Sequence, residues 1–476
     1  MDVQIDLTGR ADLAGEIYRQ LRQAVLDGRL GPGERIPPSR DLAHRLDVAR
    51  ATVVVAYDRL RAEGFLVSRT GAGTFVSDAV TPAAAAWLHR STPTDTTLRP
   101  RALWKDVALP EPFDEPPEFD FRPGVPDAAL FPYDVWRRLL GREIHARDGD
   151  GGYGDPGGHL GLRAAIAAHV AVSRGLSATV EDITITNGTQ QAVDLITRVL
   201  VDPGDQVAVE DPGYPPARRL FATLGARVVG VPVDAEGLVV DAIPARTRLV
   251  YVSPSHQFPL GTAMSLRRRL ALLEWAQLHD AAVIEDDYDS EFRFDARPVE
   301  PLQTLDPHGR VLYVGSFSKT MLATLRLGFV VAPASLHRAI QAAKFVTDWH
   351  TSLPVQATLA RFIDEGWFGR HLRRMRGVYH ARHDRVAEIL ERDFDGLLDV
   401  VAGAGGLHLS ALAESRSNAE IAAVVTKATA AGVGVQPLSD FAADGPAPAG
   451  LVLGYGAIPT DRIPDGLRLL RQCFRI

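Results

Sequence analysis

Strands and helices alternate regularly along residues 183–330, and this alternation limits the possible folds more than any other feature of the sequence. Short runs rich in β-branched residues, at 183–186, 206–210 and 249–252, are each followed by a turn or loop and then by a helical pattern. This order favours a mostly parallel sheet covered by helices on both faces, with ligands bound at the carboxyl ends of the strands. The expected fold class is therefore α/β.

A lysine follows one of these strands. Residues 310–315 have the pattern of a short buried strand, and Ser316, Ser318 and Lys319 lie in the turn that leaves it. The chain has only four lysines, so the position of Lys319 is conspicuous. A partly desolvated lysine can lose its proton and attack an aldehyde carbon, which forms a Schiff base. The alternative is an ordinary solvated lysine at the end of a strand.

Groups that suit a phosphate accompany this lysine. Phosphate accepts several hydrogen bonds and pairs bidentately with guanidinium, so two hydroxyls and the nearby Arg326 form a suitable partner set. An aldehyde-capturing amine beside a phosphate site indicates pyridoxal 5′-phosphate (PLP), which carries one aldehyde and one phosphate. A turn between the strand at 183–186 and the next helix supplies further backbone N–H groups and a positive helix end. The predicted phosphate cradle consists of Gly188, Thr189, Gln190, Ser316, Ser318 and Arg326.

A second strand ends in carboxylates, within residues 285–291. A carboxylate held against the pyridine nitrogen of PLP keeps that nitrogen protonated, and Asp286 is the candidate. Tyr288 lies two positions further on, on the same side of an extended chain, and is expected to reach the 3′ oxygen of the ring. By itself this acidic run could also bind a divalent cation or be solvated. The lysine decides for PLP, and no metal site is expected.

The first 76 residues show a different pattern. Helices are expected over 11–29, over a segment with Ser39 as its N-cap, and over 50–63, and residues 64–76 have the alternation of a two-stranded wing. This order predicts a winged helix-turn-helix, with a small interaction domain as the alternative. The third helix would point its N-terminus into the major groove of DNA. Residues 1–76 carry a charge of about +1 against −7 for the whole chain, which is too small an imbalance to argue DNA binding alone.

Two sets of motifs carry a resemblance to a known family. Ser316-Phe317-Ser318-Lys319, followed by Arg326-Leu327-Gly328 and combined with Asp286 and Tyr288, is similar to the signature of fold-type I, aspartate aminotransferase-like domains. The stretch at 33–43, with Arg50-Ala51-Thr52 and the glycines at 71–74, is similar to GntR-type DNA-binding domains. The entire chain therefore resembles the MocR subfamily of GntR-type transcriptional regulators.

The resemblance implies a domain organisation and further site residues. It implies a winged helix-turn-helix at 1–76 and a PLP-binding domain at 121–476 whose small C-terminal subdomain covers about 370–476. Residues 77–120 are rich in Pro, Ala, Thr and Asp and have no sustained period, so they are interpreted as a linker with at most a short helix at 83–90. Tyr214 would stack on the pyridine ring, and Tyr153 would reach the cofactor phosphate of the neighbouring subunit in a homodimer with shared sites. The implied DNA contacts are Arg40, Arg50, Thr52 and Gly73, the last at the tip of the wing.

Two departures from aminotransferases bear on the activity. Phe258 takes the place of the asparagine that bonds the 3′ oxygen of the ring, which leaves that contact to Tyr288, His256 or Gln257. Val452 stands nearest to the position of the arginine that holds an α-carboxylate. Efficient turnover is therefore not expected, although partial aminotransferase chemistry stays open. The alternative is an active aminotransferase with an appended DNA-binding domain.

The expected function is that of a transcriptional regulator that senses PLP or an amine. Its partners would be a double-stranded DNA operator and the small effector, and its targets would be vitamin B6 synthesis or the metabolism of amines and amino acids. No signal-peptide core and no apolar run of roughly 20 residues is found, so a cytoplasmic location without membrane contact is expected. The basic run at 371–376 is open to interpretation, either as a solvated helix face or as a dimer or DNA surface.

Overall fold

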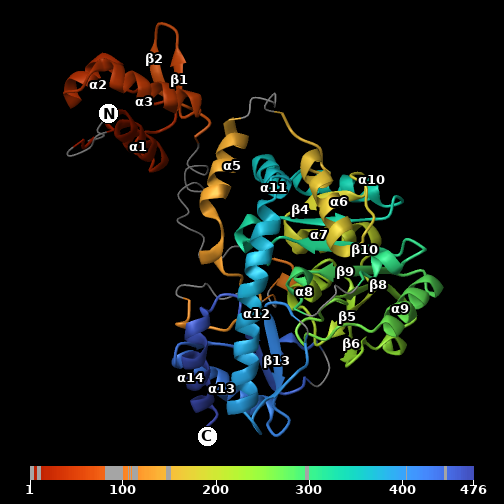
Figure 1. Cartoon of the computed structure of the whole chain (residues 1–476). Helices are drawn as coiled ribbons and strands as arrows, with labels where there is room; N and C mark the ends of the chain where they lie inside the picture. The colour runs from red at the N-terminus through yellow and green to blue at the C-terminus, as the bar shows by residue number, and fades with distance from the viewer. Residues whose placement is uncertain are drawn as a thin grey trace. The chain divides into compact units, whose positions relative to one another are not determined.

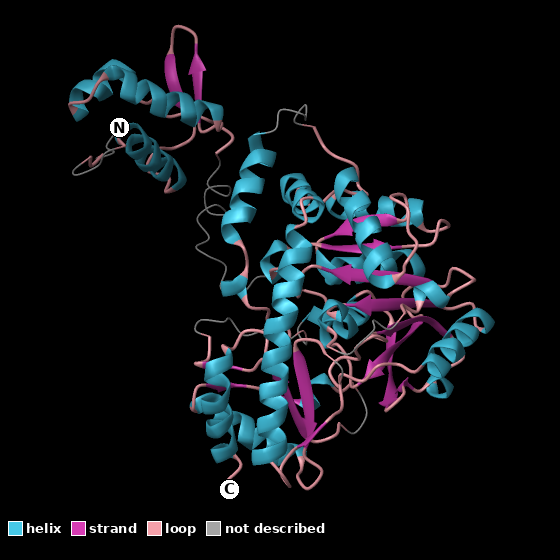
Figure 2. Cartoon of the chain, in the orientation of Figure 1, coloured by secondary structure: helices cyan, strands magenta, loops and turns pink. Residues whose placement is uncertain are grey.

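The computed structural model describes residues 5–7, 12–80, 100–104, 107, 109, 116–145, 152–294, 300–403, 405–443 and 447–475. The chain divides into two compact units, Met1–Ala102 and Leu103–Ile476. Figure 1 follows the chain from its N-terminus to its C-terminus, and Figure 2 shows its helices and strands. The helix expected at 83–90 lies outside the described residues. Within the ranges given above, no helix combines the length and the apolar character that a membrane crossing requires.

The first unit is the winged helix-turn-helix that the sequence predicts. Ile17, Leu21 and Val25 recur every four residues and bury one face of the first helix. They share one core with Val53 and Leu60 of the third helix. Two antiparallel strands form the wing. The elements are α1 (Leu13–Leu26), α2 (Ser39–Leu46), α3 (Arg50–Ala62), β1 (Leu66–Arg69) and β2 (Gly73–Val76).

One predicted detail of this unit is wrong, because Ser39 is not the N-cap of α2. The helix begins at Ser39, and Pro38 holds the cap position with an extended backbone and no side-chain hydrogen bond to the helix. The fixed φ of proline suits the start of a helix, so the helix begins there without a capping hydroxyl. The hydroxyl of Ser39 instead lies 3.4 Å from Nε of Arg50 and accepts its hydrogen bond. It therefore ties the start of α2 to the start of α3.

The second unit is built on an eight-stranded sheet with the order β4-β11-β10-β9-β8-β5-β6-β7. The neighbours β10, β9, β8, β5 and β6 pair in parallel, whereas β11 runs antiparallel to β10 and β4, and β7 runs antiparallel to β6. The sheet is therefore mostly parallel, as the sequence predicts. The strands are β4 (Ile183–Thr186), β5 (Gln206–Asp211), β6 (Arg227–Asp234), β7 (Gly237–Leu238), β8 (Thr247–Val252), β9 (Ala282–Asp287), β10 (Val311–Ser316) and β11 (Gly328–Val331).

Helices cover both faces of this sheet. Val193 and Phe221 lie in the apolar cluster of one face, together with Leu249 and Leu312 from the strands. Leu272 belongs to the cluster of the opposite face. A third cluster joins β4 and β11 to the helices at that end of the sheet. The helices are α5 (Tyr133–His145), α6 (Leu160–Arg174), α7 (Gly188–Leu200), α8 (Pro215–Thr223), α9 (Leu266–Leu278), α10 (His337–Asp348) and α11 (Leu353–Asp364).

A smaller subdomain follows the large sheet. Its four-stranded sheet has the order β12-β13-β16-β15, and the long helix α12 (Trp367–Asp393) runs from the large sheet to this subdomain (Figure 1). β14 (Val433–Gly434) pairs in parallel with β3 (Phe119–Asp120), so the chain enters this unit at the small subdomain. The other elements are β12 (Asp399–Val400), β13 (His408–Leu412), α13 (Asn418–Ala430), β15 (Gln436–Pro437), β16 (Gly450–Gly454) and α14 (Ile463–Cys473).

Candidate functional site

Loops at the carboxyl ends of the parallel strands enclose a cavity of about 650 Å³. The topology explains its place, because parallel strands bring their last residues to the same edge of a sheet. β9 contributes Asp286, β10 contributes Ser316, and the turn after β10 contributes Lys319. The lining includes these predicted cofactor residues: Thr189, Gln190, Tyr214, Asp286, Tyr288, Ser316, Ser318, Lys319 and Arg326.

The amine of Lys319 reaches across the cavity to the chain that enters the unit. Its Nζ donates a hydrogen bond of 2.6 Å to the carbonyl oxygen of Gly124. Burial lowers the pKa of Lys319, while the carboxylates of Asp289 and Asp286 oppose the shift. A lowered pKa increases the fraction of unprotonated amine, which is the form that attacks an aldehyde.

Asp286 has one oxygen that finds no partner in the described part of the chain. Its Oδ2 accepts a short hydrogen bond from the hydroxyl of Tyr251, whereas its Oδ1 is buried without a hydrogen bond. The pKa of Asp286 is raised to about 7, chiefly by burial and with a contribution from the neighbouring Asp287, while the Tyr251 bond and Lys319 oppose the shift. A buried acceptor without a donor is costly, by roughly 1–3 kcal/mol. The protonated ring nitrogen of PLP is a donor that suits the unpaired Oδ1 of Asp286.

Groups that suit a phosphate meet at the start of α7. Gly188 has a φ of +76°, and a Cβ built on it would lie 3.0 Å from Nη2 of Arg326. The absence of a side chain at position 188 therefore allows the guanidinium of Arg326 to pack against the start of α7. Arg326 Nη2 also donates to the carbonyl of Asn187 at 3.1 Å. The hydroxyl of Ser316 accepts from the backbone N–H of Ser318 at 3.1 Å. Helix N–H groups, hydroxyls and one guanidinium fit a phosphate.

The wall opposite this cradle is apolar at the positions where aminotransferases carry polar groups. Phe258 makes an edge contact with Tyr214, the predicted stacking residue, at 5.8 Å between ring centroids. Phe258 also packs on Phe441 at 5.2 Å. Val452 is buried in one cluster with Leu438 and Phe441. Phe258 and Val452, the two departures found in the sequence, therefore belong to one hydrophobic cluster, of which Phe258 and Phe441 line the cavity.

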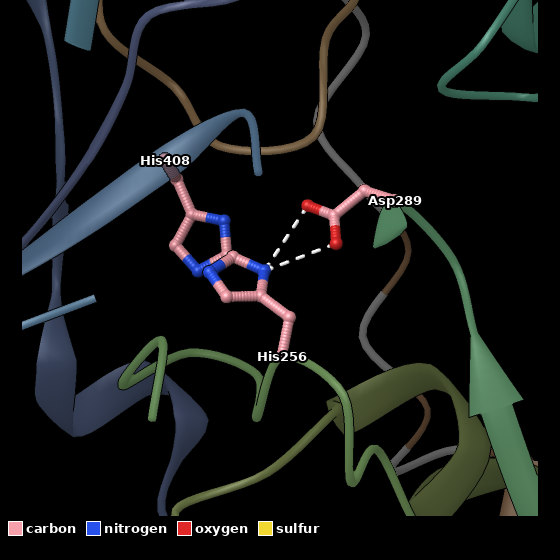
Figure 3. A group of neighbouring side chains, drawn as sticks. All are labelled: His256, Asp289 and His408. Carbon is pink, nitrogen blue, oxygen red and sulfur yellow. Dashed lines mark hydrogen bonds and ion pairs between the residues drawn. The ribbon is translucent and has the colours of Figure 1, made fainter. Parts of the chain in front are cut away.

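A hydrogen-bonded group of Tyr288, His256 and Asp289 stands beside this wall, and Figure 3 shows the contact between its imidazole and carboxylate. Nδ1 of His256 lies 3.0 and 3.2 Å from the two carboxylate oxygens of Asp289 and 2.9 Å from the hydroxyl of Tyr288. A carboxylate only accepts, so Nδ1 carries the proton and donates. This single proton points to Asp289 and is at most shared with the hydroxyl of Tyr288, so the hydroxyl cannot donate to Nδ1 and its own proton is free to be donated into the cavity.

The three candidates for the ring-oxygen contact lie differently with respect to the cavity. Tyr288 lines the cavity, whereas His256 lies behind Tyr288 and orients it. The side-chain amide of Gln257 donates to the backbone carbonyls of Pro212 and Phe258 and so stabilises the loop that carries it. Gly406 of the small subdomain packs directly against the ring of His256. A Cβ at position 406 would lie 2.2 Å from that ring, so the contact requires glycine.

The sequence did not single out Asp289 or His408, although both line the cavity. His408 comes from β13, and its Nε2 donates to the carbonyl of Pro259 at 3.0 Å. Burial lowers the pKa of His408 to about 3, so this imidazole is neutral. His256, Asp289 and His408 offer ligand atoms within 4.8 Å of one another, a set that could hold a transition metal. The hydrogen bonds to Asp289 and Pro259 already engage one nitrogen of each ring.

Tyr153 does not line the cavity of its own chain. Its side chain is 78% exposed and stacks on Trp349, with 4.3 Å between ring centroids. Phe345, which is 45% exposed, packs on the same tryptophan at 4.6 Å. The predicted role of Tyr153 at the site of a neighbouring subunit stays a prediction.

The four predicted DNA contacts lie in the first unit. Arg40 is exposed on α2, and Arg50 is exposed at the first position of α3, with Thr52 half-buried two residues later. No acidic residue occupies the first turn of α3, so the positive end of this helix is not neutralised there. Gly73 is the first residue of β2, directly after the turn at 70–72 that forms the tip of the wing.

Two family models match the chain. Residues 13–76 match the family described as bacterial regulatory proteins, gntR family, and residues 120–447 match aminotransferase class I and II. The first match lies within the first unit of the structure, and the second match lies within the second unit.

Full-length relatives share both parts. The probable rhizopine catabolism regulatory protein MocR of Rhizobium meliloti is 38% identical over 96% of this chain and 93% of its own length. The HTH-type pyridoxine biosynthesis transcriptional regulator PdxR of Corynebacterium glutamicum is 32% identical over 94% of this chain and 93% of its own length. Among solved structures, the kynurenine aminotransferase of Pyrococcus horikoshii in complex with PMP is 29% identical, with a TM-score of 0.69 over 75% of this chain and 90% of its own length.

The unpartnered oxygen of Asp286 generates a prediction for stability without PLP. The pKa of about 7 in the folded protein exceeds the usual value near 4, so the buried charge destabilises the fold increasingly as the pH rises from about 4 to 7. We expect Asp286→Asn to raise the free energy of unfolding at pH 8 by about 2–4 kcal/mol, and by much less at pH 5. Denaturant titrations at both pH values measure this. Asp461→Asn at an exposed position serves as the control, and an equal effect at both pH values would contradict the prediction.

The Tyr288, His256 and Asp289 group generates a spectroscopic prediction. A hydrogen bond donated to the ring oxygen stabilises negative charge there, so weakening it favours the protonated form of the bound cofactor up to higher pH. We expect Tyr288→Phe, which removes the hydroxyl without changing the charge of the site, to raise the pH midpoint of the visible absorbance of the PLP-loaded protein by about one unit, which corresponds to about 1.4 kcal/mol. A pH titration of the spectrum measures the midpoint. An unchanged midpoint would show that Tyr288 does not donate to the ring oxygen.

Proposed function

Because the chain belongs to the MocR subfamily of GntR-type transcriptional regulators, we propose that its aminotransferase-like unit senses PLP or an amine and thereby controls how the protein acts on DNA. One observation carries the proposal. A lysine amine, a buried carboxylate oxygen without a donor, and a phosphate cradle face the same cavity. These are the three groups that the aldehyde, ring nitrogen and phosphate of PLP need.

Each of these residues has a separate task in holding the cofactor. Lys319 supplies the amine for covalent attachment, and Asp286 accepts the proton of the ring nitrogen. Ser316, Ser318 and Arg326 hold the phosphate, together with the backbone at Gly188, Thr189 and Gln190. Tyr288 donates to the ring oxygen, Tyr214 covers one face of the ring, and Tyr153 of a second subunit completes the phosphate site. When bound, PLP supplies an electron-withdrawing ring and an aldehyde carbon at which amines exchange.

The cavity leaves room for a small effector beside the cofactor. Polar groups of Asp289 and His408 and the apolar wall around Phe258 face this space. An effector that binds there alters DNA binding only if its affinity differs between two arrangements of the protein. The relatives named for pyridoxine biosynthesis and rhizopine catabolism support target genes in vitamin B6 synthesis or in the metabolism of amines and amino acids.

DNA binding belongs to the gntR unit. Arg50 and Thr52 at the start of α3 would contact bases or phosphates in the major groove, with Arg40 on the backbone and Gly73 beside the minor groove. The wing lets the chain approach the duplex from a second side. A cytoplasmic location, where bacterial DNA lies, is part of the proposal.

A homodimer with shared sites is also part of the proposal. The stacked and exposed rings of Tyr153 and Trp349, with exposed Phe345 beside them, form an aromatic patch of the kind found at protein interfaces. Burial of this patch against a second copy would carry Tyr153 towards the site of its neighbour.

Catalytic transamination is the second candidate. The lowered pKa of Lys319 favours it, because this amine could carry protons as well as hold the cofactor. The apolar cluster of Phe258, Phe441 and Val452 opposes it, because it puts no cation at the position where aminotransferases carry the carboxylate-binding arginine. The one arginine of α8 that lines the cavity, Arg219, stands at a different position. Rapid turnover of common amino acids by the purified protein would displace the sensor proposal.

Removal of the lysine tests the sensor. In Lys319→Ala we expect no PLP to remain attached after borohydride treatment, and we expect DNA binding that no longer changes when PLP is added. Mass spectrometry measures the attachment, and footprinting of the DNA upstream of the gene, with and without PLP, measures the response. Lys344→Ala would be a poor control because Lys344 is buried, so Lys427→Ala at the exposed end of α13 is used. A response that persists in Lys319→Ala would contradict the proposal.

Removal of an arginine tests the DNA contact. We expect Arg50→Ala to weaken binding to the operator by about 1–3 kcal/mol if the side chain reads a base, and to relax specificity at that position. Arg59→Ala lies at the other end of the same helix and is the matched control. Gel-shift titrations at fixed salt compare the two variants, and equal losses in both would contradict the assignment.

A further inference from the structure

A second cavity lies in the aminotransferase-like unit and shares no lining residue with the first. It has a volume of about 210 Å³ and lies between the end of α6, the short helix Ser290–Phe292 and α12. Its α12 wall includes Arg373 and Arg376, from the basic run at 371–376 whose role the sequence left open. The proposed function uses none of these residues.

Arg174, the last residue of α6, lines this cavity and is not fully satisfied. The residue is 6% exposed, and its Nη2 lies 2.8 Å from Oδ2 of Asp287 and 2.8 Å from the hydroxyl of Ser255. Its Nε and Nη1 are buried and have no hydrogen-bond partner in the described ranges. Two buried donors without acceptors are costly, so an acceptor that entered the cavity would be bound favourably.

The groups around Arg174 leave this cavity positive. Arg376 donates through Nε and Nη2 to the backbone carbonyl of Glu291, at 3.2 and 2.8 Å. Because this acceptor is neutral, it holds the guanidinium in position without cancelling its positive charge. Arg373 is exposed, and no ion pair with another described residue involves it. The opposing carboxylates are Asp287 and Glu291, the latter 3.8 Å from His169. Three guanidiniums therefore face two carboxylates.

We propose that the second cavity binds a phosphate group, either as inorganic phosphate or as part of a small phosphate ester. Guanidinium pairs bidentately with phosphate, and the orphan nitrogens of Arg174 form the base of the site while Arg373 and Arg376 close its rim. Ser290 lines the same cavity and adds a hydroxyl donor, whereas the hydroxyl of Ser173 already donates to the backbone carbonyl of His169 at 2.8 Å. A volume of about 210 Å³ holds a phosphate and a few further atoms.

The site is placed to influence the cofactor cavity. The same guanidinium that would bind the phosphate holds Asp287, which is next to Asp286, and Ser255, which is next to His256. A bound anion competes with Asp287 for Arg174 and changes the charge that Asp286 experiences. This coupling rests on the proposed PLP site, whereas phosphate binding itself does not.

The test uses full-length protein loaded with PLP and reduced with borohydride, so that the first phosphate cradle is filled. Calorimetric titration with inorganic phosphate, and separately with glycerol 3-phosphate, should show one saturable site per chain for at least one of the two. We expect the double variant Arg373→Ala, Arg376→Ala to weaken binding at least tenfold. Arg374→Ala, an exposed neighbour on the same helix that does not line the cavity, should bind as the parent does.

The outcomes separate this site from the cofactor site. Absence of saturable binding, or equal affinity in the double variant and the parent, would overturn the phosphate site. If the chain takes up no PLP, the same comparison on unloaded protein decides the second site, because its variants leave the first cradle intact. In unreduced, PLP-loaded protein we expect phosphate to shift the pH midpoint of the visible absorbance, and no shift would overturn the coupling. Arg174→Lys, which keeps the charge beside Asp287, should bind phosphate more weakly while the protein stays folded.

Discussion

The buried carboxylate of Asp286 is the constraint on which the rest of the site depends. The strand β9 carries three acidic residues in succession, and its alternation sends Glu285 and Asp287 to one side and Asp286 to the other. Glu285 accepts two backbone N–H groups, from Leu302 and Gln303, and Asp287 accepts from Arg174 and Tyr313. The two acids on one side therefore connect β9 to neighbouring segments by hydrogen bonds and an ion pair, whereas Asp286 on the other side has one oxygen without a hydrogen bond in the described part of the chain. A ligand that donates a hydrogen bond to this oxygen would offset the free-energy cost of its burial.

The surroundings of this carboxylate explain why a fold shared with enzymes suits a sensor. An aminotransferase must hold a carboxylate substrate in one pose while protons move, whereas a sensor needs only to register occupancy. Val452, nearest to the position of the arginine that holds that carboxylate, packs with Leu438 and Phe441, and Tyr288 is the candidate for the polar ring-oxygen contact in place of position 258. The candidate cofactor-holding groups are present, whereas these two substrate-orienting positions are apolar. This division is what a regulator requires.

Local patterns allowed much of the fold and site to be predicted from the sequence. Lys319 and Asp286 are visible because each ends a recognisable strand, and Arg50 because it starts a helix. Asp289 and His408 were missed because their roles arise from contacts between distant segments. His408 comes from the small subdomain and meets a loop more than a hundred residues earlier, which no periodicity reports. Ser39 was misjudged as a cap because proline can also hold that position.

The imidazole of His256 shows how such long-range contacts give a side chain its role. A histidine in a loop can donate, accept or bind a metal, and its sequence neighbours do not choose among these. Asp289 fixes the proton on Nδ1, and Gly406 from the other subdomain leaves the ring its space. Since a protonated Nδ1 cannot accept from Tyr288, contacts from both subdomains keep the tyrosine proton away from His256. If Tyr288 donates to the cofactor ring as proposed, a movement of the small subdomain against the large one would change that hydrogen bond, and so would couple domain geometry to cofactor state without a catalytic step.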